Sequence, residues 1–316
     1  MEPLRLILDT DMDTDCDDAG ALAIVHHFSE IGLCSLKGVI CDVPYIEAAV
    51  CTKLLNKYYS SSEIPIGLLR MTDGERSEAH CKYDDFRKGI PEHRRYNRLF
   101  PLWLNHIPEK YDKSFPDSTS IYRKVLADSP DGSIVICAIG LMSALGKLLE
   151  SGPDDISPLS GRELVAGKVD KLVTMAVLEY QRESPEEFNW RMDLPSALKV
   201  LEQWPTRIVL SSSGWSILTG SALMKETKNT NPLNFIYRTY LQGVGSSRPS
   251  WDQTAVLYAL GRTDLFDIRW GSRPVYDKQK DVFEWKNDPG NTFGYAVPKL
   301  SDEDMAALIE KMMRYK

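Results

Sequence analysis

Short apolar runs alternate with amphipathic patterns along most of this chain. The apolar runs have the length of strands and cover residues 4–8, 36–41, 64–68, 133–139, 171–177 and 206–210. The amphipathic patterns predict helices at about 17–29, 46–59, 117–128, 141–151 and 195–203. Because parallel strands need a crossover, usually a helix, this alternation indicates a largely parallel sheet. We therefore predict an α/β fold in one domain, residues 1–316, with a doubly wound, mostly parallel sheet and helices on both faces.

Two segments depart from this alternation. Near the end of the chain we expect a hairpin at about 274–285, then a last helix from Ser301, a favoured N-cap, to about Met313. Residues 70–115 are dense in charged and aromatic side chains and show no clear period, which predicts a long excursion off the sheet edge. Segments of that length without regular structure are usually functional lids or disordered. We expect a lid, in which Trp103 is a candidate for contact with a substrate.

Composition narrows the class of partner. A net charge of -7 and a pI near 5.4 argue against nucleic acid or an anionic membrane. No run of about 18 apolar residues predicts a membrane span, and the acidic segment that begins at Asp9 leaves no room for a signal peptide. The six cysteines form no CxxC pair, so we expect reduced, mostly buried thiols. These features predict a soluble cytoplasmic protein that binds a small molecule, and they leave a homo-oligomer open.

The densest chemical signal is an acidic loop between the first predicted strand and the first predicted helix. Six aspartates fall within ten residues, at Asp9, Asp11, Asp13, Asp15, Asp17 and Asp18. Two carboxylates about 4 Å apart repel by roughly 4 kcal/mol at an effective dielectric near 20, so such a cluster needs a cation or bound protons. Oxygen ligands favour a hard cation such as Ca²⁺. For Asp13 and Asp15 a solvated loop charge is an equal alternative.

Two known motifs share these residues but fit poorly. An EF-hand needs Gly at loop position 6 and Glu at position 12, and no register of the loop supplies them. A phosphatase of the haloacid dehalogenase type needs Thr or Val four residues after the nucleophilic Asp, where counting from Asp9 or Asp11 gives Asp13 or Asp15. A phosphohydrolase therefore remains only a distant alternative.

Three segments together resemble the nucleoside hydrolase family. Residues 8–22 are similar to the longer form of that family's acidic loop, followed by an Ala-rich helix. Residues 187–189 read Glu-Phe-Asn and precede Asp193 by four positions, as in the second family signature. Trp251 followed by Asp252 matches the third signature, an aromatic or His residue before Asp. The order of the three is that of the family, and the resemblance spans essentially the whole chain.

The resemblance implies metal-dependent hydrolysis of the N-glycosidic bond of a ribonucleoside or related N-riboside, yielding ribose and a free base. It implies that Asp11 is the general base and also a metal ligand. Asp18 and Asp252 would supply further carboxylate ligands, and the backbone carbonyl of Ile139 would complete the set. A cation of this kind activates water for attack on an oxocarbenium-like sugar.

The resemblance also implies substrate contacts. Asp15 or Asp17 would contact the ribose, depending on the end from which the extended loop is counted. Gln181 stands where the family usually has Asn, and Gln makes the same hydrogen bonds. Asp42 stands where many members have Asn and some purine-directed members have Asp. After the strand at 133–139, the family's Gly-Pro-Leu-Thr-Asn is replaced by Gly-Leu-Met-Ser-Ala.

Glu187 and Asn189 are two positions apart. On an extended segment their side chains would share one face and reach two ribose hydroxyls, while Phe188 would pack in the core.

Trp251 is the most consequential departure from the family pattern. Many members have a His there that protonates the leaving base, and Trp has no acidic proton to donate. Either Trp251 activates a purine by stacking, or the chain binds ribosides through a metal without turning them over. We expect the other tryptophans outside the excursion to be packing residues, namely Trp190, Trp204, Trp215, Trp270 and Trp285.

Overall fold

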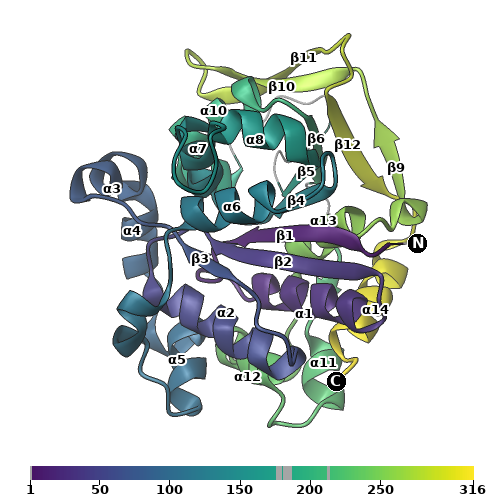
Figure 1. Cartoon of the computed structure of the whole chain (residues 1–316). Coiled ribbons are helices and arrows are strands. Elements are labelled where there is room, and N and C mark those ends of the chain that lie inside the picture. Colours follow the sequence, from purple (N-terminus) through teal and green to yellow (C-terminus); the bar gives the residue numbers. More distant parts are fainter. Residues whose placement is uncertain (1, 176–179, 181–186, 212–213) are drawn as a thin grey trace.

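A central sheet of eight strands organises the molecule, in the order β3-β2-β1-β4-β5-β6-β12-β9 (Figure 1). The computed structural model describes residues 2–175, 180, 187–211 and 214–316. The strands are β1 (Leu4–Thr10), β2 (Cys34–Cys41), β3 (Ile66–Leu68), β4 (Ile134–Ala138), β5 (Val169–Met175), β6 (Arg207–Ser211), β9 (Phe266–Arg269) and β12 (Phe293–Pro298). Among the described strands of this central sheet, β12 and β9 are the only antiparallel pair. Because the chain winds outward from β1 in both directions, the predicted doubly wound, mostly parallel sheet is confirmed.

Both faces of this sheet are buried. Leu6 and Leu8 of β1 belong to one apolar cluster, whereas Ile7 between them belongs to the other. In β4, Cys137 lies on the side of Leu8 and Ile136 on the side of Ile7. Alternate side chains of a strand point to opposite faces, so a strand covered on both sides reads as a continuous apolar run. This is why the strands were visible in the sequence.

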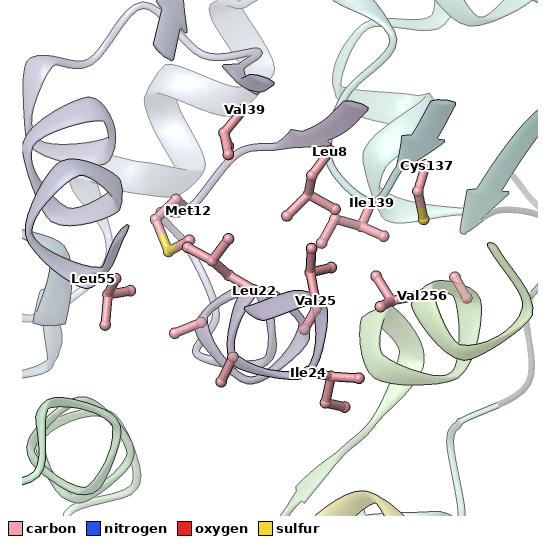
Figure 2. Close-up of a cluster of buried hydrophobic side chains, with 14 of the residues drawn as sticks. Leu8, Met12, Leu22, Ile24, Val25, Val39, Leu55, Cys137, Ile139 and Val256 are labelled. Atoms are coloured by element: carbon pink, nitrogen blue, oxygen red, sulfur yellow. The ribbon is translucent and has the colours of Figure 1, made fainter. Parts of the chain in front are cut away.

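One face is covered by helices α1 (Asp17–Glu30), α2 (Ile46–Tyr59), α13 (Trp251–Ala259) and α14 (Asp302–Met313). Outside them lie α5 (Tyr96–Trp103), α12 (Pro232–Leu241) and α11 (Ser221–Glu226). Figure 2 shows Leu22 and Val25 of α1 directed toward Leu8 and Ile139, with Val256 of α13 beside them. α1 is buried along most of its length, and its Ala and Gly residues allow this close packing.

The opposite face is covered by α6 (Ser118–Ala127), α7 (Ser143–Glu150), α8 (Gly161–Lys168) and α10 (Leu194–Gln203) (Figure 1). The hairpin of β10 (Ser272–Asp277) and β11 (Val282–Asn287) packs against this side and confirms the predicted hairpin. The predicted strands and helices agree with the structure to within about two residues at most ends. The exception is the run at 171–177, since residues 176 and 177 lie outside the described ranges. α8, α11, α12, β9 and β12 were not predicted.

The excursion between β3 and α6 is helical, which corrects the expectation of an irregular segment. It contains α3 (Asp73–Ala79), α4 (Cys81–Lys88) and α5, with 3-10 turns η1 (Glu92–Arg94) and η2 (Pro108–Ser114). None of these helices exceeds eight residues, so none carries enough turns to show a period in sequence. α5 packs against α2 and α12.

Two compositional expectations bear on the fold. All six cysteines are free; Cys81 is exposed and the other five are buried. None of the helices within the described ranges combines the length and apolarity that crossing a membrane requires.

Candidate active site

A cavity of about 290 Å³ opens at the carboxyl edge of the sheet, beyond the ends of β1 and β4. Here neighbouring strands send the chain to opposite faces, and ligands of open α/β sheets bind at this switch point. The described lining consists of Asp11, Thr14, Asp15, Asp17, Asp18, Phe86, Ile139, Met175, Glu187, Phe188, Asn189, Trp215, Tyr240, Arg248, Trp251 and Asp252. Most of the residues predicted for the site are therefore brought together.

Three buried carboxyl groups meet at the base of the cavity. Asp17 and Asp18 lie in the first turn of α1, and Asp252 lies in the first turn of α13. One oxygen of each lies within 4.8 Å of the others, and all three side chains are buried. Helix N-termini favour negative charge, so two helix ends support this cluster. The prediction named Asp11, Asp18, Asp252 and the carbonyl of Ile139 as metal ligands; Asp18 and Asp252 lie in this cluster together with Asp17.

The electrostatics of this cluster fit a hard divalent cation. Burial, and then repulsion by neighbouring carboxylates, raises the pKa of Asp17, Asp18 and Asp252 well above the usual range. Carboxyl groups in that state hold protons unless a cation neutralises them. The donors are all oxygens, as Ca²⁺ prefers. The cavity is also lined by Ile139, whose carbonyl accepts a hydrogen bond of 3.0 Å from Asn189 Nδ2.

Asp11 contacts this cluster and is held by the excursion. Its carboxyl group hydrogen-bonds that of Asp18, and burial raises its pKa to about 6. Its Oδ2 accepts hydrogen bonds from Tyr83 Oη at 3.1 Å and from Thr14 Oγ1 at 3.3 Å. Tyr83 is fully buried on α4. Nothing in the sequence placed Tyr83 beside the predicted general base.

Asp13 and Asp15 are each paired with an arginine, so neither is a freely solvated loop charge. Asp13 is buried and accepts hydrogen bonds from Arg87 Nε at 2.8 Å and Asn97 Nδ2 at 2.6 Å. Asp15 accepts from both Nε and Nη2 of Arg248. Asp15 lines the cavity, whereas Asp13 does not. The extra length of the loop thus supplies two anchoring points.

Glu187 and Asn189 both line the cavity, but not as an extended segment. Glu187 is the N-cap of α9 (Phe188–Met192), and its Oε2 accepts hydrogen bonds from the amides of Asn189 at 2.9 Å and Trp190 at 3.2 Å. Burial raises the pKa of Glu187 to about 7. Phe188 was expected in the core; instead it is half-buried, lines the cavity and packs edge-on against Phe86, with centroids 4.8 Å apart.

Asp42 is placed differently from its predicted role. It is fully buried and absent from the cavity lining, where a contact with substrate was expected. Burial, with repulsion by Asp9, raises its pKa well above the usual range. A Cβ at Gly140 would lie 2.3 Å from Asp42 Oδ2 and 2.4 Å from the Asp11 amide nitrogen, so this position requires glycine. Gln181 lies outside the described residues.

Aromatic side chains form the outer part of the cavity. Trp251 is half-buried, and its ring lies 5.7 Å from that of Trp215, which is 73% exposed. Trp215 also lines the cavity, so its assignment to packing was wrong. Gly214 has a φ of +145°, and a Cβ there would lie 2.6 Å from the Trp251 backbone. This glycine therefore lets the two tryptophans approach. Trp103 stacks on Phe235 at 4.5 Å and is not among the lining residues.

The sequence contained one usable signal for the residues that were missed. Trp215 follows the predicted strand 206–210 by five positions, and the carboxyl ends of parallel strands meet at one edge. Phe86, Tyr240 and Arg248 carried no comparable signal.

Comparison with known proteins shows the fold but no close relative. In sequence, no protein-family model and no curated protein matches this chain. In structure, the inosine-uridine preferring nucleoside hydrolase from Bacillus anthracis is similar, with a TM-score of 0.66, 13% identity, and coverage of 98% of this chain and 99% of that one. The purine-preferring ribonucleoside hydrolase from Gardnerella vaginalis has a TM-score of 0.66 and 14% identity, with coverage of 99% of this chain and 100% of that one. The type III effector XopQ, in complex with adenosine diphosphate ribose, has a TM-score of 0.68 and 14% identity, with coverage of 99% of this chain and 94% of that one. The chain therefore has the nucleoside hydrolase fold.

Proposed function

We propose that this protein hydrolyses the N-glycosidic bond of a ribonucleoside or related N-riboside with the help of a divalent cation, Ca²⁺ or a similar ion. The observation that carries the proposal is the composition of one cavity. Buried carboxyl groups of Asp11, Asp17, Asp18 and Asp252 lie at its base. The aromatic side chains of its described lining form a rim at its mouth, namely Phe86, Phe188, Trp215, Tyr240 and Trp251. A sugar with several hydroxyl groups fits the polar base of the cavity, and a planar nucleobase fits the aromatic rim. The nucleoside hydrolases among the fold neighbours support the same reaction.

The residues divide the chemistry between them. A cation held by Asp11, Asp17, Asp18 and Asp252, together with the Ile139 carbonyl, would lower the pKa of a bound water and orient ribose hydroxyls. Asp11 accepts the proton of the attacking water, and Tyr83 holds the Asp11 carboxylate in place.

The remaining contacts belong to the substrate. Glu187, the N-cap of α9, and Asn189, in the first turn of the same helix, bind ribose hydroxyls. Trp251 stacks on the departing base. Asp15 pairs with Arg248 and orients its guanidinium 5.2 Å from the ring of Trp251. Because Asp15 is occupied in this way, we assign the contact with the cation and the ribose to Asp17.

A non-catalytic riboside-binding protein is the second candidate. The specific observation in its favour is Trp251 at the cavity mouth, since indole supplies no acid for the leaving base. A fold neighbour, XopQ, is known in complex with adenosine diphosphate ribose.

The test is release of reducing sugar from a panel of ribosides in millimolar Ca²⁺, with the variant Asp11→Asn. We expect turnover of at least one riboside and a loss of about 10²-fold or more in the variant, because the amide accepts no proton. Asp85→Asn, the same change at an exposed site, is the matched control and should keep full activity. Binding without sugar release would favour the second candidate, and wild-type rates in Asp11→Asn would remove Asp11 as the base.

A further inference from the structure

Acidic side chains outnumber basic ones in the described lining of the cavity. Its described lining contains six carboxyl groups, those of Asp11, Asp15, Asp17, Asp18, Glu187 and Asp252. Arg248 is the one cationic side chain in that lining, and the carboxylate of Asp15 neutralises it through two hydrogen bonds. If the proposed divalent cation holds Asp11, Asp17, Asp18 and Asp252 as carboxylates, its two positive charges offset only half of their four negative charges. A cationic group on the substrate is therefore favoured over a neutral or anionic one.

The aromatic rim offers ring faces to such a group. The Trp215 and Trp251 rings are tilted by 49° to each other at 5.7 Å, and Phe86 meets Phe188 at 4.8 Å. Trp215 and Phe86 are 73% and 47% exposed, so their faces are open to a ligand. Cations bind to the faces of aromatic rings, most strongly to Trp.

Among the described lining residues, none at the aromatic rim is an acid that could readily protonate a departing base. All five histidines of the chain are among the described residues, and none lines the cavity. Burial raises the pKa of the Tyr240 hydroxyl, which makes it a weaker acid, and Arg248 keeps its proton at any working pH. Burial raises the pKa of Glu187 to about 7, but its Oε2 accepts hydrogen bonds from two backbone amides and we assign its carboxyl group to the ribose, not to the base. The aglycone that suits this rim is one that leaves without needing a proton.

We infer that the substrate is an N-riboside whose aglycone is a planar heteroaromatic cation, with a ribosylpyridinium as the simplest case. This inference rests on the proposed function. When the C1′–N bond breaks, its electron pair passes to the ring nitrogen and discharges the positive charge, so the aglycone leaves as a neutral molecule. Water adds to C1′ and gives one proton to Asp11, then to solvent. The sum is riboside cation plus water giving ribose, neutral heteroarene and one proton.

The experiment compares a ribosylpyridinium, nicotinamide riboside, with the neutral purine riboside inosine on the full-length protein in Ca²⁺. We expect kcat/KM to be higher for the pyridinium by about 5- to 30-fold, the factor that cation–π contacts of this kind supply. One proton should be released for each ribose from the pyridinium. Its rate should hold as pH rises from neutrality, whereas the rate with inosine should fall.

Two variants separate charge recognition from packing. Trp215→Leu should lower kcat/KM for the pyridinium more than for inosine, and Trp215→Phe should restore part of the difference. Trp103→Leu, which changes a partly exposed tryptophan away from the cavity, is the control and should leave both rates unchanged. Equal or faster cleavage of inosine, or equal losses on both substrates in Trp215→Leu, would overturn the inference while the glycosidase proposal stands. Cleavage of neither riboside by the wild type would also overturn the inference, and the wider riboside panel would then decide the proposed function.

Discussion

At the residue scale, neighbours decide what each acidic side chain of the loop does. Asp13 and Asp15 are the same residue type two positions apart, yet one is buried against Arg87 of the excursion and the other meets Arg248 in the cavity. No arginine of the described part of the chain forms an ion pair with Asp17 or Asp18, and these two residues lie beside Asp252 instead. The loop therefore separates its anchoring carboxylates from those available to a cation.

A second residue-scale feature is a histidine held neutral in the core. His26 Nε2 lies 2.8 Å from Asn56 Oδ1, and burial lowers the pKa of His26 from its ordinary value of 6.5 to about 4. Below pH 6.5 the unfolded chain binds a proton at this residue and the folded chain does not. Its contribution to stability is therefore complete above pH 6.5 and is lost as pH falls toward 4.

We expect this histidine to cost about 2 kcal/mol of stability between pH 7 and pH 5. The measurement is the free energy of unfolding in urea at both pH values for wild type and His26→Gln, whose amide also donates to Asn56. The variant should lose less stability at pH 5 than the wild type. Parallel losses in the two proteins would show that His26 is not responsible.

At the element scale, α4 joins the excursion to the site. Tyr83, Phe86 and Arg87 lie at i, i+3 and i+4, so they share one face of this helix. They contact Asp11, the cavity and Asp13 respectively. This inner face is aromatic and charged where a core-facing helix would be aliphatic, and for that reason hydrophobic periodicity did not reveal it.

The Arg87–Asp13 ion pair should hold α4 against the acidic loop. Asp13→Asn leaves the guanidinium of Arg87, 12% exposed, without its closest anion, and breaking a buried pair costs about 3 kcal/mol. We place the loss at that lower value because Arg87 Nη2 also lies 3.6 Å from Glu47. The free energy of unfolding in urea measures this loss, and the variant Asp85→Asn, with the same substitution at an exposed site, is the reference.

Adding Arg87→Met to Asp13→Asn removes the stranded charge and should recover part of the loss. A double variant that is less stable than Asp13→Asn by the full cost of Arg87→Met would mean that the two side chains are not coupled.

At the scale of the whole molecule, the carboxyl cluster joins two segments more than 230 residues apart in the sequence. Asp17 and Asp18 begin α1, Asp252 lies in the first turn of α13, and these helices pack against each other under the sheet. A cation bound here would stabilise the folded state by about 2.7 kcal/mol at a hundredfold excess over its Kd. Without it, the three buried carboxyl groups must hold protons or repel one another.

We therefore expect Ca²⁺ to raise the melting temperature by several degrees and a chelator to reverse the change. Asp252→Asn should abolish the response to Ca²⁺. Asp170→Asn, the same change at a surface residue, should preserve it. Elemental analysis after desalting gives an independent reading, and a melting temperature that ignores Ca²⁺ in the wild type would contradict a metal site in this cluster.

The sequence by itself determined the features that short-range periodicity and contiguous motifs carry. The buried strands are continuous apolar runs, helix α2 was predicted at its observed bounds, and the acidic loop is a single segment between β1 and α1. The doubly wound sheet follows from their alternation, because parallel strands require crossovers.

Only the tertiary structure decided how the site is completed. Tyr83, Trp215 and Arg248 reach it from three segments far apart in the chain, and the cap turn at Glu187 is too short to carry a period. Asp42 follows β2 much as Asp11 follows β1, yet close packing against Gly140 keeps it behind the cavity. Such placements depend on which strand ends become neighbours and on how closely backbones approach, and these distances exist only once the sheet has formed.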